Sequence, residues 1–99
     1  MEALTGKEAR WRRRQMCVLD GQDPLPAAIR TISASGAFVE TNARPHLGST
    51  VSLRHPEAGA INGHVCALHA DGVALRFGAD ATAVAFAMLA IAADMSRPA

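Results

Sequence analysis

The 99-residue chain has few aromatic residues, few cysteines and almost no lysine, and it lacks a long apolar run. The longest candidate, the Ala-rich stretch 81–93, is flanked by aspartates and is shorter than the 18 or more residues that span a bilayer. The N-terminus also lacks the basic, apolar and small-residue order of a signal peptide, so we expect a cytoplasmic protein. With 49% hydrophobic and 19% charged residues, the composition excludes a disordered chain.

The side chains needed for catalysis or metal binding do not occur in suitable patterns. Two cysteines are too few for a disulfide framework, and we expect Cys17 and Cys66 to be buried, reduced thiols. The four histidines are not spaced like ligands of a zinc site: His46, His55, His64 and His69. No serine lies in a G-x-S-x-G elbow. We therefore expect no enzyme, no metal and no cofactor.

The net charge of +1 is the sum of two unequal parts. Residues 1–14 carry one Lys and four Arg against two Glu, which gives +3, and residues 15–99 carry five Arg against seven acidic side chains, which gives −2. Nine of the ten cationic residues are Arg. The planar guanidinium binds phosphate and guanine edges through two parallel hydrogen bonds, so this bias indicates an anionic ligand rather than general solubility.

Short β-compatible segments separated by Gly, Pro, Asn and Asp occupy most of the chain: residues 16–19, 28–33, 37–41, 50–54, 61–69 and 73–77. The period then changes, and Asp80 as N-cap predicts a helix over 81–95. On that helix Val84, Met88, Ile91 and Met95 form a stripe that we expect to pack on the core. This order of elements predicts an antiparallel barrel or sandwich with the helix on an edge or open end.

Two polar elements stand beside the first two predicted strands. Arg10-Trp11-Arg12-Arg13-Arg14 precedes the first strand, and it could be a solvated arm or a multivalent phosphate site. Trp11 could stack on a base or anchor the arm. Thr31-Ile32-Ser33-Ala34-Ser35-Gly36 ends the second strand in short hydroxyl side chains and a Gly turn, where a flat ligand can approach the backbone.

Together these elements resemble the PilZ family, bacterial receptor domains for cyclic diguanylate (cyclic di-GMP). Arg10 and Arg14 match the family's RxxxR element, and Ser33 and Gly36 match its [D/N]xSxxG element. The resemblance covers about residues 8–95 and implies a mainly β fold, a six-stranded antiparallel barrel with a C-terminal helix. We therefore expect a flexible arm at 1–9, one PilZ-like domain at 10–95 and a tail at 96–99.

The resemblance also implies the ligand site. It assigns phosphate and guanine binding to Arg10, Arg13 and Arg14, and the other side of the ligand to Thr31, Ser33 and Gly36. Thr31 stands where the family pattern has Asp or Asn, and a neutral hydroxyl there replaces two charged acceptor oxygens. Only 16 residues separate Arg14 from Thr31, which is short for the family.

Three functions follow from these features. The first is a cyclic di-GMP receptor that signals through a separate, unidentified effector protein. The second is a degenerate PilZ domain that has lost dinucleotide binding and serves as a protein-interaction adaptor. The third, nonspecific nucleic-acid binding by the arginines and Trp11, is disfavoured by the charge of −2 on the rest of the chain. Membrane insertion is not expected.

Overall fold

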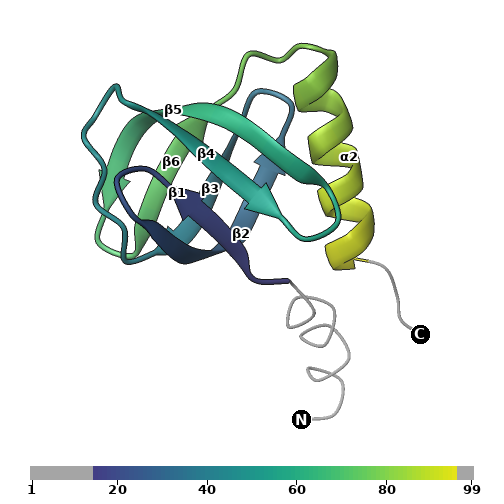
Figure 1. The fold of residues 1–99 in the computed structure, drawn as a ribbon. Coiled ribbons are helices and arrows are strands. Elements are labelled where there is room, and N and C mark those ends of the chain that lie inside the picture. Colours follow the sequence, from purple (N-terminus) through teal and green to yellow (C-terminus); the bar gives the residue numbers. More distant parts are fainter. Residues whose placement is uncertain (1–14, 96–99) are drawn as a thin grey trace, which may run out of the picture.

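The computed structural model describes residues 15–95, which form six strands followed by one helix (Figure 1). The elements are β1 (Cys17–Asp20), β2 (Pro24–Ser33), β3 (Gly36–Thr41), β4 (Thr50–His55), β5 (Gly59–His69), β6 (Gly72–Arg76) and α2 (Ala81–Met95). The predicted fold class, mainly β with a C-terminal helix, is confirmed.

The strands close into a barrel in the order β1-β2-β3-β6-β5-β4, and every neighbouring pair is antiparallel. Pairing of β1 with β4, for example Leu19 with Leu53, completes the closure. A closed barrel satisfies the backbone hydrogen bonds that an open sheet leaves exposed at its edges. The predicted six-stranded barrel is therefore confirmed.

Alternating strand residues point into the barrel and fill it with aliphatic side chains. The largest fully buried side chains are Leu19, Leu53, Val39, Val65, Val73 and Cys17. At the end of the barrel covered by α2, the ring of Phe86 lies edge-on to those of Phe77 and His55. The small number of aromatic residues thus suffices because β-branched residues and Leu occupy the interior.

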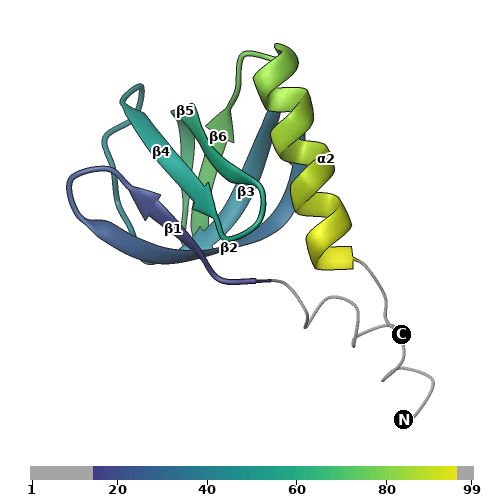
Figure 2. The ribbon, with the colours of Figure 1, turned by 45° about the vertical axis from the view of Figure 1, so that its right-hand side comes forward.

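The helix begins and ends where the sequence predicted, and it packs against β2 and β5 (Figures 1 and 2). The Ala83 amide donates a hydrogen bond to Asp80 Oδ1 at 2.9 Å, which confirms Asp80 as the N-cap. Among residues 15–95, no helix is long and apolar enough to cross a membrane.

The predicted packing face of the helix is wrong. Val84, Met88 and Ile91 are 43%, 65% and 44% exposed, and the side chain of Met95 lies outside the described residues. The buried helix residues are instead Ala83, Phe86, Ala87, Ala90 and Asp94. Small alanine side chains let the helix approach the barrel closely, and Phe86 then fills the remaining space.

Two smaller expectations are also corrected. β2 begins at Pro24, earlier than the predicted residue 28, and its added residues pair with β1, with Pro24 and Pro26 at exposed positions. The cysteines are both free, but only Cys17 is buried. Cys66 is exposed because it follows the inward-facing Val65, and its thiol donates to the Ala74 carbonyl at 3.4 Å.

Candidate functional site

The second polar element of the sequence forms the β2–β3 hairpin. Thr31 pairs with Phe38 and Ser33 pairs with Gly36, so Ala34 and Ser35 make a two-residue turn. A bulge between Ile29 and Thr31 shifts the alternation by one residue. Ile29 therefore faces the core, whereas both Thr31 and Ser33 are exposed on the outer face of the barrel.

Ser33 fastens the turn of this hairpin. Its Oγ accepts a hydrogen bond from the Ser35 amide at 3.2 Å and lies 3.0 Å from Ser35 Oγ. The Ser35 carbonyl in turn accepts from the Phe77 amide at 2.9 Å, which ties the turn to the residue that follows β6. The hydroxyls of Ser33 and Ser35 are thus held in place by the turn itself.

Gly36 is required here by close packing. A Cβ at this position would lie 2.3 Å from the Leu75 carbonyl oxygen on β6, far inside normal contact. Its φ does not lie in the left-handed region, where the described glycines are Gly48 and Gly59. The glycine therefore lets β3 and β6 approach each other, and it also leaves the outer face bare at this point.

An open depression of about 380 Å³ lies along the hairpin. Its lining consists of Thr31, Ile32, Ser33, Ser35, Gly36, Ala37, Phe38 and Leu75. The hydroxyl groups and the aromatic ring of this lining offer hydrogen bonds together with an apolar surface. Such a shallow, mixed surface suits a flat polar ligand better than a reaction that needs water excluded.

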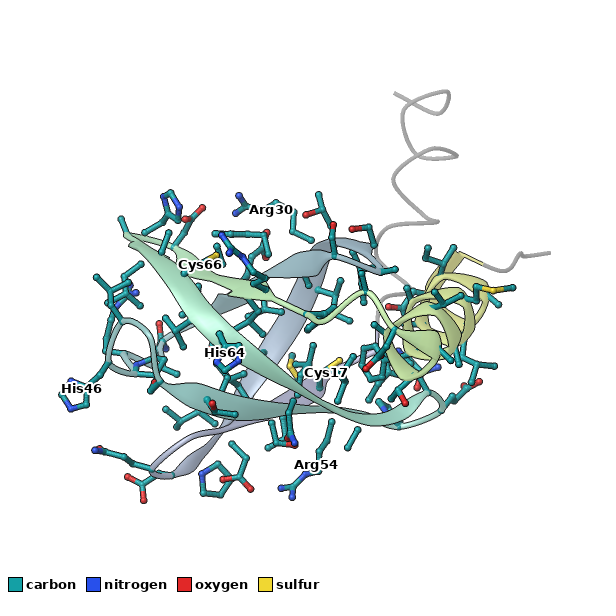
Figure 3. The ribbon with its side chains drawn as sticks, turned by 90° about the horizontal axis from the view of Figure 1, so that it is seen from above. Cys17, Arg30, His46, Arg54, His64 and Cys66 are labelled. Atoms are coloured by element: carbon teal, nitrogen blue, oxygen red, sulfur yellow. The ribbon has the colours of Figure 1, made fainter. Side chains whose placement is uncertain are left out.

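Arg30, the residue at the bulge and labelled in Figure 3, forms two ion pairs on the outer face of the barrel. Its Nε donates to Glu40 Oε2 at 2.7 Å, its Nη2 donates to Asp71 Oδ2 at 2.5 Å, and its guanidinium carbon lies 4.6 Å from the centre of the Phe38 ring. Hydrogen bonding to Arg30 lowers the pKa of the Asp71 carboxyl. Arg30 therefore orders the flank of the depression.

The first polar element, with Arg10, Arg13 and Arg14, lies outside the described residues. Within β2, only Pro24–Ala27 pair with β1. Because the two strands are antiparallel, the N-terminal end of β1 lies toward the half of β2 that carries Thr31 and Ser33. The described chain therefore begins, at Gln15, on the side of β2 that leads to the hairpin.

A comparison with models of protein families finds the PilZ domain over residues 7–90. The chain belongs to the PilZ domain family. The proposed resemblance is thereby confirmed over most of the chain. PilZ domains are a cyclic di-GMP-binding family and act as binding or adaptor domains. Neither the curated proteins nor the solved structures contain a significant match.

This PilZ domain also contains a buried polar pair that sequence reasoning missed. His55 Nδ1 accepts from the amides of Glu57 and Ala58 at 3.0 and 3.1 Å, so the proton lies on Nε2, which donates to Asp94 Oδ1 at 3.1 Å. Asp94 also accepts from the Gln15 amide at 3.3 Å. The end of α2, the β4–β5 turn and the start of β1 thus meet at one carboxylate.

The sequence contains no signal for this pair, because 39 residues separate its members. Burial, and secondarily the charge of Asp94, raise the pKa of the nearby Cys17 thiol to about 12, which keeps it protonated and unreactive. Within residues 15–95 of the PilZ domain, no three His, Cys, Asp or Glu side chains form a group that could hold a metal ion.

Proposed function

We propose that residues 10–95 form a cyclic di-GMP receptor that signals through a separate protein partner. Arg10, Arg13 and Arg14 would bind the phosphates and guanine edges of the ligand, and the outer face of the β2–β3 hairpin would hold its other side. The observation that carries this proposal is the open depression at Thr31, Ser33 and Gly36, in a member of a cyclic di-GMP-binding family.

The chemistry of the two sides is complementary. The arginine segment supplies charge-assisted hydrogen-bond donors, and guanine offers paired acceptors, N7 and O6, on its major-groove edge. On the hairpin, the hydroxyls of Thr31 and Ser33 offer neutral acceptors, and Gly36 allows close approach to the backbone. Two ligand phosphates would offset the mutual repulsion of the arginines and draw the segment against the hairpin. The changed surface would then be available to a partner.

Thr31 determines how tightly such a ligand is held. An Asp in its place would accept charge-assisted hydrogen bonds from the Watson–Crick edge of guanine, each of which contributes about 1.5–3 kcal/mol. We therefore expect the Thr31→Asp domain to bind roughly 10- to 150-fold more tightly than the wild type.

Isothermal titration of the intact chain with cyclic di-GMP tests the proposal. We expect binding by the wild type, tighter binding by Thr31→Asp and no binding by Arg14→Ala. Arg54→Ala is the matched control, since Arg54 pairs with Asp20 at 3.2 Å and lies on the opposite side of the barrel from Arg30 (Figure 3). A Kd of about 100 μM corresponds to a binding free energy of about 5.5 kcal/mol. Absence of heat from the wild type at about 100 μM ligand would therefore refute the receptor function.

The adaptor function is the alternative outcome of the same experiment. It predicts a protein partner that binds equally well with and without cyclic di-GMP. It also predicts that Arg14→Ala leaves binding of that partner unchanged. A ligand-dependent partner interaction would exclude it.

A further inference from the structure

A row of cross-strand neighbours runs over the outer face of the barrel, from the β2–β3 hairpin across β6 to β5. The register places Ser33 on β2 opposite Gly36 on β3, Gly36 opposite Arg76 on β6, and Arg76 opposite His64 on β5. Neighbouring strands lie about 4.8 Å apart, so the backbone of Arg76 is only about 10 Å from that of Ser33. Gly36 places no side chain between them.

Arg76 differs from the other described arginines in having no side-chain acceptor among residues 15–95. Within residues 15–95, the remaining guanidiniums are all engaged: Arg30 with Glu40 and Asp71, Arg54 with Asp20, and Arg44 with the carbonyls of Ala70 and Gly72. Arg76 is exposed and forms no hydrogen bond or ion pair through its side chain with any described residue.

In the part of the chain that the structure describes, no side chain beside Arg76 compensates its charge. Its cross-strand neighbours are Gly36, which has no side chain, and His64, whose Nδ1 lies 3.2 Å from Thr50 Oγ1 (Figure 3). The acidic groups on the nearby flank of the hairpin, Glu40 and Asp71, are bound to Arg30. An anion on this face would therefore meet a free guanidinium.

We propose that Arg76 binds a phosphate of the dinucleotide from the β6 side. This inference rests on the proposed function and adds a contact outside both sequence motifs. A ligand seated over Gly36 would be held by Thr31 and Ser33 at one side and by Arg76 at the other. Since Thr31 adds no negative charge to this face, the positive charge of Arg76 would act on the phosphate undiminished.

The test is titration of the intact chain with cyclic di-GMP in the Arg76→Gln and Arg76→Lys variants. Loss of one charge-assisted hydrogen bond should weaken binding by Arg76→Gln roughly 10- to 150-fold. Arg76→Lys should retain most of the affinity, because an ammonium still binds phosphate as a point charge. Arg54→Gln, the matched control on β4, should bind like the wild type.

A second readout separates ligand contact from a structural effect. If Arg76 neutralises a phosphate, the affinity of Arg76→Gln should fall less steeply with added salt than that of the wild type. Its free energy of unfolding without ligand should be unchanged. Wild-type binding together with unaltered affinity and salt dependence in Arg76→Gln would overturn this inference and leave the receptor function standing. Absence of wild-type binding would overturn both.

Discussion

Gly36→Ala tests whether the motif glycine serves the fold independently of any ligand. The added Cβ would lie 2.3 Å from the Leu75 carbonyl oxygen, whereas an ordinary carbon–oxygen contact is about 3.3 Å. The two strands must therefore separate by about 1 Å at this point. Such overpacking costs about 1–3 kcal/mol. Weakening of the neighbouring bond from the Phe77 amide to the Ser35 carbonyl costs about 1 kcal/mol more.

Alanine also restricts the unfolded chain, which offsets about 0.4–1 kcal/mol of that cost. We expect a net loss of about 2 kcal/mol, which lowers Tm by roughly 8–16 °C in a domain of this size. Urea denaturation and calorimetry without ligand would measure it.

The matched control is Gly78→Ala, in the loop before the helix. Its Cβ would meet Asp80 Oδ2 at 3.6 Å, an ordinary contact, so this variant should be as stable as the wild type or about 0.4–1 kcal/mol more stable. Equal urea midpoints for Gly36→Ala and Gly78→Ala would refute the packing argument. The glycine would then serve the ligand alone.

Three further outcomes follow from the described contacts. Asp94→Ala should lose about 1–3 kcal/mol of stability in urea denaturation, because the buried Nε2–H of His55 loses its acceptor. Asp94→Asn, which keeps one oxygen, should lose less. Equal losses in the two variants would contradict the role of this hydrogen bond. A thiol reagent at pH 8 should label Cys66 rapidly and Cys17 only after denaturation, since the pKa of Cys17 is raised to about 12; rapid labelling of both would show that Cys17 is accessible. Asp80→Ala should cost about 1 kcal/mol through loss of the N-cap, and an unchanged Tm would count against the cap.

The strands and the helix limits were predictable from the sequence because their signals are local. Alternation, turn residues and the Asp80 cap each act over a few positions, and the six strands and α2 appear where those signals place them, apart from the earlier start of β2 at Pro24. The buried face of α2 was not predictable in the same way. The helix carries apolar residues on all of its faces. The stripe through Val84 and Met88 and the stripe through Ala87 and Ala90 therefore both fit the helical period. Close approach to the barrel selects the alanines.

The candidate site likewise combines residues that are close in the sequence with residues that only the folded barrel brings together. Thr31, Ser33 and Gly36 are near each other in the chain, and a hairpin brings them together as the pattern predicted. Arg76 follows 40 residues after Gly36 and becomes its neighbour only through the pairing of β3 with β6. No local pattern specifies that register, because it depends on closure of the whole barrel. The His55–Asp94 pair depends likewise on where the helix ends against the β4–β5 turn.

The residues of the second motif differ in what they reveal about ligand binding. Ser33 fastens the turn and Gly36 permits the approach of β6, so the fold alone would favour both residues even in a domain that binds no dinucleotide. Thr31 is exposed, and its side chain forms no hydrogen bond with another described residue. Replacing it should therefore alter the proposed ligand-binding face without altering the fold. The choice between receptor and adaptor thus depends on Thr31 and on the arginine segment, which is why Thr31→Asp and Arg14→Ala are the decisive variants.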